Sequence, residues 1–209
     1  MTSIGVPPSL AKGARTILGR PLTEQEAGSF LKYMNLLVKW NKTHRLVGSA
    51  DPEWIIERLL LDSLLFLRIL PAGVRWVLDF GTGAGVPGIP IKIVWPEIDM
   101  ALLESKRRRV SFLLTTVREL GLTRTRVLGV RAEDLVAQSG GTFDAVVMRC
   151  AGNPDRVLPL AAGFVREGGI VVAAGPPKPV ALTLGRWVQV PGVREKTTRR
   201  FAVLVKAGE

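Results

Sequence analysis

The residues of this sequence best suited to chemistry form a glycine-rich segment directly behind an apolar run, VLDFGTGAGVPGIP at residues 77–90. Glycines in such a turn let the backbone approach a ligand closely and adopt positive φ. A helix that begins behind the turn presents unpaired N–H groups, which favour negative or polar ligand atoms. The last three glycines also match the G-x-G-x-x-G pattern of dinucleotide-binding turns. The segment therefore predicts a site for a nucleotide-like ligand.

Asp79 narrows the choice of that ligand. It stands two residues before Gly81, at an expected strand end, where a carboxylate would repel a pyrophosphate. S-adenosylmethionine carries a sulfonium and an ammonium group and no phosphate, so an acid facing the turn would attract it. Glu104 ends the next apolar run and is placed for two ribose hydroxyls, although dinucleotide sites share that arrangement. We predict S-adenosylmethionine as the cofactor.

Further candidates follow the later apolar runs. RAEDL offers Ala132 and Glu133 as neighbours of an adenine ring, but an ordinary helix start with acids in its first turn explains these letters equally well. Arg149 could hydrogen-bond the target base or a cofactor carboxylate, with a structural salt bridge as the alternative. Cys150 could supply the thiolate of a cytosine-C5 methyltransferase, but it lacks a preceding proline and fits a small buried residue better.

Basic residues gather where a polyanion could bind. Lys and Arg outnumber Asp and Glu by 29 to 18 over 209 residues, a net charge of +11, which favours nucleic acid as a partner. Four consecutive cations open an expected helix, where the macrodipole disfavours positive charge. A nearby RNA backbone would offset that cost, and a solvated charge run is the alternative. The RNA-binding candidates are Lys106, Arg107, Arg108 and Arg109, then Arg199 and Arg200, and more weakly Lys39, Lys42 and Arg45.

The composition makes several kinds of site and location unexpected. One cysteine and one histidine cannot form an intrachain disulfide and do not suggest a zinc cluster. The longest apolar segment, residues 55–70, contains four charged side chains and does not predict a membrane span. The N-terminal residues lack the order of a signal peptide. We expect a cytoplasmic monomer that binds no metal and no membrane.

Two patterns define the elements that must position these residues. Residues 1–70 read as a helical extension, with a capping box at Thr23 and Glu26 and a second helix start at Asp51 and Pro52. Residues 71–209 alternate short apolar runs with helical stretches, as α/β doubly wound (Rossmann-like) sheets do. We expect the two parts to pack as one unit. The expected strands, buried on both faces, are 74–80, 99–104, 125–130, 143–149 and 168–174, with helices at 86–95, 105–120, 132–139 and 153–166 and an antiparallel edge hairpin at 186–192 and 199–206.

Several segments resemble one protein family. They occur in the order seen in the RsmG (GidB) family of bacterial 16S rRNA guanine-N7 methyltransferases: WNKTHRLVGSADPEWIIERLLLDSL, VLDFGTGAGVPGIPIKIVWPE, LLESKRRRVSFL, RAEDL and FDAVVMRCAG. The resemblance runs from about Leu36 to the end of the chain, and GTGAGVPGIP is its most specific part. The chain departs from the family pattern at Arg45-Leu46-Val47, where N-L-T is usual, and at Arg58-Leu59, where an Arg-His pair is usual.

The resemblance implies a methyltransferase sheet, S-adenosylmethionine, and 16S rRNA or the assembled small ribosomal subunit as the substrate. By position it also implies cofactor contacts from Gly81, Val86, Ala132, Glu133 and Arg149. Together with the residues chosen above, the expected cofactor set is Asp79, Gly81, Thr82, Gly83, Gly85, Val86, Glu104, Ala132, Glu133 and Arg149, of which Arg149 is also the catalytic candidate.

Guanine N7 fits a chain without an acid–base constellation, because N7 has an in-plane lone pair and carries no proton. Such a reaction needs the base held in line with the methyl group. Three alternatives stay open: methylation of another RNA site or base such as cytosine C5, methylation of a small molecule, and a non-catalytic RNA-binding module on a methyltransferase-like fold.

Overall fold

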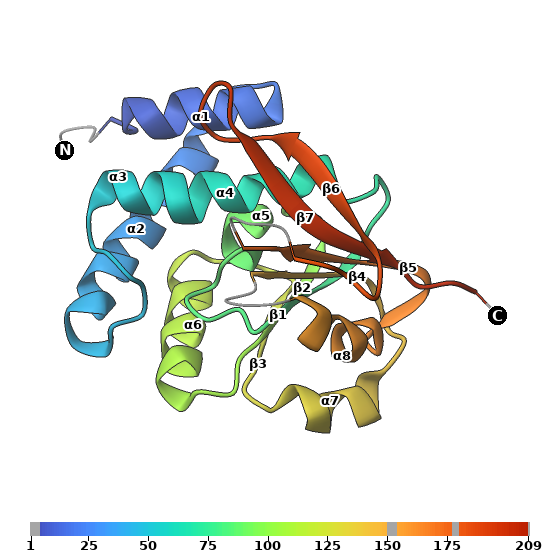
Figure 1. Cartoon of the computed structure of the whole chain (residues 1–209). Coiled ribbons are helices and arrows are strands. Elements are labelled where there is room, and N and C mark those ends of the chain that lie inside the picture. The colour runs from blue at the N-terminus through green and yellow to red at the C-terminus, as the bar shows by residue number, and fades with distance from the viewer. Residues whose placement is uncertain (1–4, 150–153, 177–179, 209) are drawn as a thin grey trace.

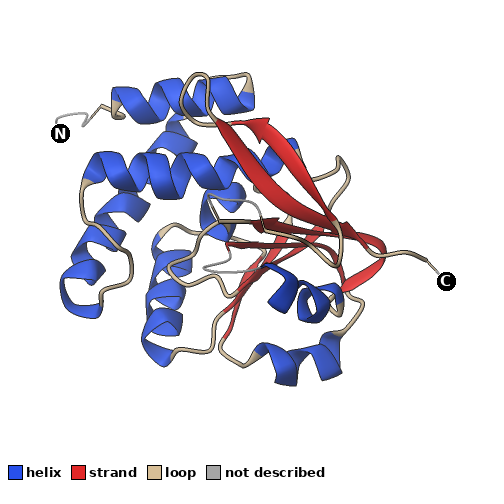
Figure 2. Cartoon of the chain, in the orientation of Figure 1, coloured by secondary structure: helices blue, strands red, loops and turns tan. Residues whose placement is uncertain are grey.

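The computed structural model describes residues 5–149, 154–176 and 180–208, and its centre is one seven-stranded sheet (Figures 1 and 2). The strand order is β3-β2-β1-β4-β5-β7-β6. The first five strands pair in parallel, whereas β7 pairs antiparallel with both β5 and β6. The strands are β1 Trp76–Phe80, β2 Asp99–Leu103, β3 Thr125–Leu128, β4 Phe143–Arg149, β5 Val165–Ala174, β6 Arg186–Pro191 and β7 Thr198–Val205.

Helices cover both faces of the sheet (Figure 2). Successive residues of a strand point to opposite faces, so Val77 of β1 joins one core cluster and Leu78 joins the other. The N-terminal helices, α5 and α6 cover the Val77 face, and α7 and α8 cover the Leu78 face. The helices after β1 are α5 Gly88–Val94, α6 Arg107–Glu119, α7 Ala132–Ser139, the 3-10 turn η3 Pro154–Arg156 and α8 Leu158–Ala162.

The N-terminal extension is helical, as the sequence predicts, and shares its core with the sheet. Thr23 and Glu26 form the capping box at the start of α2. Asp51 caps the next helix by accepting a 2.8 Å hydrogen bond from the Trp54 N–H. The extension consists of α1 Pro8–Leu18, α2 Glu24–His44, α3 Pro52–Ile55, the π-helical turn η1 Ile56–Leu61, α4 Asp62–Leu64 and the 3-10 turn η2 Leu65–Arg68. The division of the chain at residue 70 stays a prediction.

Three details differ from the sequence-based expectation. Helix α1 lies in a segment for which we predicted no separate helix. Strand β3 is the sheet edge and is only partly buried, because it has a neighbour on one side alone. The expected helix at 153–166 contains only the short η3 and α8, since β5 already begins at Val165. The expected C-terminal hairpin is present at the other edge as β6 and β7. Within the described residues, no helix combines the length and apolar character needed to cross a membrane.

Candidate functional site

The glycine-rich loop between β1 and α5 is tightly packed on one side and open on the other. Gly81, Gly83 and Gly85 all have positive φ, at 65°, 60° and 92°. A Cβ atom on Gly85 would lie 2.3 Å from Cδ1 of Ile89, so a side chain there would displace the buried Ile89. A Cβ atom on Gly81 would meet no atom within 4 Å. The loop therefore offers exposed backbone at its start to a ligand.

Asp79 holds this loop in shape. Its carboxylate is fully buried, and Oδ2 accepts a 2.7 Å hydrogen bond from the Gly88 N–H and another from the Thr82 hydroxyl. The second oxygen, Oδ1, has no hydrogen-bond partner among the residues that the structure describes. Burial raises the pKa of Asp79 to about 7, against the lowering effect of these bonds and of Arg149. Asp79 thus bonds to the loop itself, and a direct contact with a ligand stays a prediction.

Tyr33 of α2 supports the loop from the N-terminal extension, and the sequence analysis missed it. Its hydroxyl is buried and donates a 2.6 Å hydrogen bond to the Ala84 carbonyl oxygen. Burial and the nearby Asp79 raise the pKa of Tyr33, so the hydroxyl remains protonated. Tyr33 lies three residues after Phe30, on the apolar stripe of α2, but no sequence pattern reveals its partner. The extension and the glycine loop are therefore directly linked.

Glu104, at the carboxyl end of β2, is engaged at the start of α6. It accepts a 2.9 Å hydrogen bond from the Lys106 N–H, and its Oε2 lies 3.4 Å from Nη1 of Arg109. Arg109 therefore differs from the other cations of its cluster, because it lies against a carboxylate next to the glycine loop. Lys106, Arg107 and Arg108 are exposed, and the first turn of α6 contains no acid.

Arg149 ends β4 beside the loop and shares a carboxylate with Arg199 of β7. Nη2 of Arg149 lies 3.6 Å from Oδ2 of Asp62, and Nε of Arg199 lies 2.9 Å from Oδ1. In the described part of the chain, the Arg149 guanidinium makes no hydrogen bond, whereas Arg199 donates one of 2.9 Å to the Gly175 carbonyl. Burial lowers the pKa of Arg149 and Asp62 opposes that effect, but an arginine remains charged.

A cavity of about 320 Å³ brings part of the glycine loop together with Arg149 and Arg199, whereas Asp79, Gly85 and Glu104 do not line it. The glycine loop forms one wall, the segment after α2 forms another, and the two arginines stand between them. Its lining residues are Leu46, Val47, Gly48, Trp54, Leu59, Gly81, Thr82, Gly83, Ala84, Val86, Arg149, Ala174 and Arg199. This cleft lies beyond the carboxyl ends of the parallel strands, where ligands of such sheets bind.

The remaining predicted residues lie outside this lining. Ala132 and Glu133 begin α7, where Ala132 packs against a core cluster and Glu133 is exposed. Arg200 pairs with Gln189 of β6 and does not line the cavity. Cys150 lies outside the described residues. Asp62 was not predicted as a site residue, because it is one charged residue within an apolar helix.

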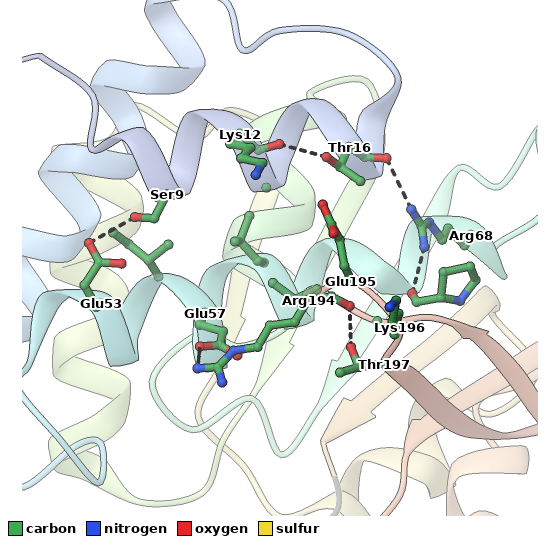
Figure 3. Close-up of a pocket in the computed structure, with 16 residues that line it drawn as sticks. Ser9, Lys12, Thr16, Glu53, Glu57, Arg68, Arg194, Glu195, Lys196 and Thr197 are labelled. Atoms are coloured by element: carbon green, nitrogen blue, oxygen red, sulfur yellow. Dashed lines mark hydrogen bonds and ion pairs between the residues drawn. The ribbon is translucent and has the colours of Figure 1, made fainter.

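A larger cavity, of about 560 Å³, lies between α1, the helix after Asp51 and the β6–β7 loop (Figure 3). Two of its arginines have partners: Arg194 lies 2.6 Å from Glu57, and Arg68 donates to the carbonyls of Pro191 and Thr16. None of the glycine-loop residues lines it. We therefore take the smaller cleft as the candidate functional site.

Comparisons with known proteins show which family the chain resembles. The GidB family model, described as rRNA small subunit methyltransferase G, matches residues 26–175. The chain is 35% identical over 167 residues to a ribosomal RNA small subunit methyltransferase G of Desulfitobacterium hafniense strain Y51, covering 79% of this chain and 69% of that protein. It is 31% identical over 215 residues to one of Xanthomonas axonopodis pv. citri strain 306, covering 96% and 98%.

Solved structures support the fold. A SAM dependent methyltransferase from Aquifex aeolicus superposes with a TM-score of 0.51 at 19% identity, covering 74% of this chain and 94% of that one. A putative methylase, HI0767 from Haemophilus influenzae, gives 0.52 at 15% identity, covering 71% and 89%.

Proposed function

This chain belongs to the GidB family, rRNA small subunit methyltransferase G, and from that premise we propose that it methylates N7 of a guanine in 16S rRNA with S-adenosylmethionine as the methyl donor. The observation that carries the proposal is one cleft at the carboxyl edge of the sheet, where the open side of the glycine loop meets the Arg149 guanidinium. A cytoplasmic location is part of the proposal, because ribosomal RNA is the substrate.

The residues of the cleft fit the proposed methyl donor. Space is open beside Gly81, and among the described residues the N–H groups of Arg149 are free to bind a carboxylate. Each oxygen of Glu104 has a second lone pair available to a ribose hydroxyl. Near Asp79, a ligand ammonium group would favour the ionised carboxylate. We assign the ribose to Glu104, the carboxylate to Arg149 and the backbone contacts to the loop, with Ala132 and Glu133 as proposed neighbours of the adenine.

The proposed reaction requires the side chains mainly to orient the base relative to the methyl group. S-adenosylmethionine supplies an electrophilic methyl group when it is bound. Guanine N7 carries no proton, so the protein removes none, and the cleft must hold the base in line with that group. The target base has to leave its stack to enter the cleft. Lys106, Arg107 and Arg108, exposed at the start of α6, are proposed to bind the RNA backbone.

Calorimetry with S-adenosylmethionine, S-adenosylhomocysteine and NAD tests the proposed cofactor. We expect the first two to bind and NAD not to bind. Gly83→Val should abolish binding, because Gly83 has a φ of 60° that valine adopts poorly. Gly28→Val, at an exposed glycine of α2 with nothing within 4 Å of a Cβ atom, is the matched control and should bind normally. Tight binding of NAD would overturn the assignment.

Nucleoside mapping distinguishes the acceptors. Small-subunit rRNA from a deletion strain should lack one 7-methylguanosine, and expression of either the wild-type chain or Cys150→Ser should restore it. A requirement for the Cys150 thiol, or a covalent adduct with RNA, would favour cytosine C5 instead. A chain that binds RNA but restores no modified nucleoside would be a non-catalytic RNA-binding module.

A further inference from the structure

We propose that Asp62 is a positioning residue that holds Arg149 in the cleft for the carboxylate of the bound methyl donor, braced by Arg199. The inference rests on the proposed function above. Among the described residues, the ion pairs and hydrogen bonds of the Asp62 carboxylate are with the two arginines, through which we expect it to act.

The three side chains form one cluster although they come from distant parts of the chain. Asp62 follows the π-helical turn of the extension, Arg149 ends β4 and Arg199 lies on β7. Both arginines line the cleft, and Asp62 lies behind them with 14% of its side chain exposed. The carboxylate therefore separates two guanidinium groups at the wall of the cleft.

The π-helical turn explains how Asp62 comes to face this cluster. The Asp62 N–H bonds to the Glu57 carbonyl, five residues back, where a regular α-helix would use the residue four back. Compared with a regular helix, one extra residue turns the following side chains by about 100° around the axis. Leu60, Leu61 and Leu64 stay buried in the core while Asp62 points to the arginines.

Asp62 contacts Arg199 more closely than it contacts Arg149. Arg199 donates two hydrogen bonds, from Nη2 to Oδ2 at 3.4 Å and from Nη1 to the Gly175 carbonyl, and its Nε lies 2.9 Å from Oδ1 as an ion pair without a hydrogen bond. Arg149 lies 3.6 Å from Oδ2, which is too far for a hydrogen bond but close enough for strong attraction. Asp62 therefore fixes where the Arg149 guanidinium lies and leaves its donors available to a ligand.

The charges of the cluster do not cancel, and this suits an anionic group. Two guanidinium groups face one carboxylate, and the other charged or titratable groups that act on Arg149 are Asp79 and Tyr33. Asp79 is buried beneath the loop, and the Tyr33 hydroxyl is protonated. A ligand carboxylate against Arg149 would complete two ion pairs for two arginines.

Asp62→Asn tests the proposal with two nucleoside ligands that differ by the amino-acid group. Without the carboxylate, the two half-buried guanidinium groups repel each other and Arg149 leaves its place. We expect S-adenosylhomocysteine to bind about 10- to 100-fold more weakly, the range that loss of a charge-assisted hydrogen bond produces. Binding of 5′-methylthioadenosine, which lacks the carboxylate, should change by less than about threefold. Asp62→Glu should restore part of the difference.

Asp144→Asn is the matched control. Asp144 lies 2.7 Å from Nε of Arg166 and is as well shielded as Asp62, with 17% of its side chain exposed, but it lies at the opposite end of β4. This variant should bind both ligands as the wild type does. Thermal unfolding of each variant shows whether it is folded.

Equal weakening of both ligands by Asp62→Asn, or unchanged binding of S-adenosylhomocysteine, would overturn the proposed role of Asp62 and leave the proposed function intact. A wild-type chain that binds neither ligand would contradict the proposed function as well.

Discussion

Two groups of cations lie beyond the carboxyl ends of the parallel strands, and they differ in exposure and in whether a carboxylate pairs with them. At the start of α6, Lys106, Arg107 and Arg108 are exposed, and the first turn of the helix contains no acid. In the cleft, Arg149 and Arg199 keep only 27% and 23% of their side chains exposed and share the carboxylate of Asp62. The first group is visible in the sequence as a run, whereas the second is assembled by the fold.

The difference teaches what each group is suited to bind. Exposed charges are screened by salt and interact with any phosphate that approaches, whatever the sequence of the RNA. Half-buried charges interact more strongly and hold one geometry, but they require a compensating anion. We therefore expect the α6 group to supply affinity that depends on salt and the cleft group to supply a positioned interaction.

The largest expected effect is on cofactor affinity and methyl transfer, and it should come from a substitution in the cleft. Arg149→Gln removes the guanidinium beside the glycine loop, and we expect S-adenosylmethionine affinity and methyl transfer to fall by about 100-fold, as when a charge-assisted hydrogen bond is removed. Calorimetry and a transfer assay measure this. Arg200→Gln, on β7 but outside the cavity lining, is the control and should keep cofactor affinity. Similar losses in both variants would remove the distinction between the cleft and its surroundings.

A pH effect on stability should distinguish the glycine loop beside the cleft from the α6 cations. Burial raises the pKa of Asp79 to about 7 from its usual value near 4, so the folded chain binds a proton that the unfolded chain releases between those values. The free energy of unfolding should therefore fall as the pH rises from 4 to 7, by about 1.4 kcal/mol per pH unit at most from this group. Denaturant titrations of the wild type and of Asp79→Asn, compared at pH 5 and pH 8, measure the difference.

The asparagine variant should lose most of this pH dependence while its side-chain oxygen still accepts from the Gly88 N–H. Variants of the α6 cations should keep it, because lysine and arginine remain charged over this range. An unchanged pH profile in Asp79→Asn would show that the carboxylate is ionised in the folded chain.

The smallest effect on stability should come from α6. The sequence analysis grouped Arg109 with the other cations at this helix start, but Arg109 lies against Glu104, so the informative pair is Arg107→Gln with Arg108→Gln. RNA affinity should fall, and its log–log salt slope should flatten by about 0.7 to 0.9 for each phosphate that the variant no longer neutralises. The free energy of unfolding should rise by a few tenths of a kcal/mol, about what relief of the helix dipole provides.

The double variant Lys12→Gln with Arg15→Gln removes the same charge at two exposed positions of α1 and is the control for α6. A salt slope that changes equally in both double variants would mean that only net charge matters and that α6 is no docking surface.

Local patterns predicted much of the fold, and long-range contacts explain what they missed. Strand β4 has the predicted bounds, 143–149, because a buried parallel strand is a continuous apolar run. The partial exposure of β3 was missed because the residues of a strand do not reveal whether it lies in the middle or at the edge of the sheet.

The same contrast holds in the candidate site. The loop and the start of α6 follow from adjacent residues. The cluster of Asp62, Arg149 and Arg199 does not, because its members are separated by 87 and 50 positions and meet only through the π-helical turn and the strand order. Tyr33 was missed for the same reason, since its partner is a backbone carbonyl 51 residues away.

The hydrogen bond from the Tyr33 hydroxyl to the Ala84 carbonyl joins the N-terminal extension to the glycine loop, and any energetic coupling through this contact would be reciprocal. If a ligand at the loop changed the position of α2, a partner that held α2 in that position would change the ligand's affinity by the same factor.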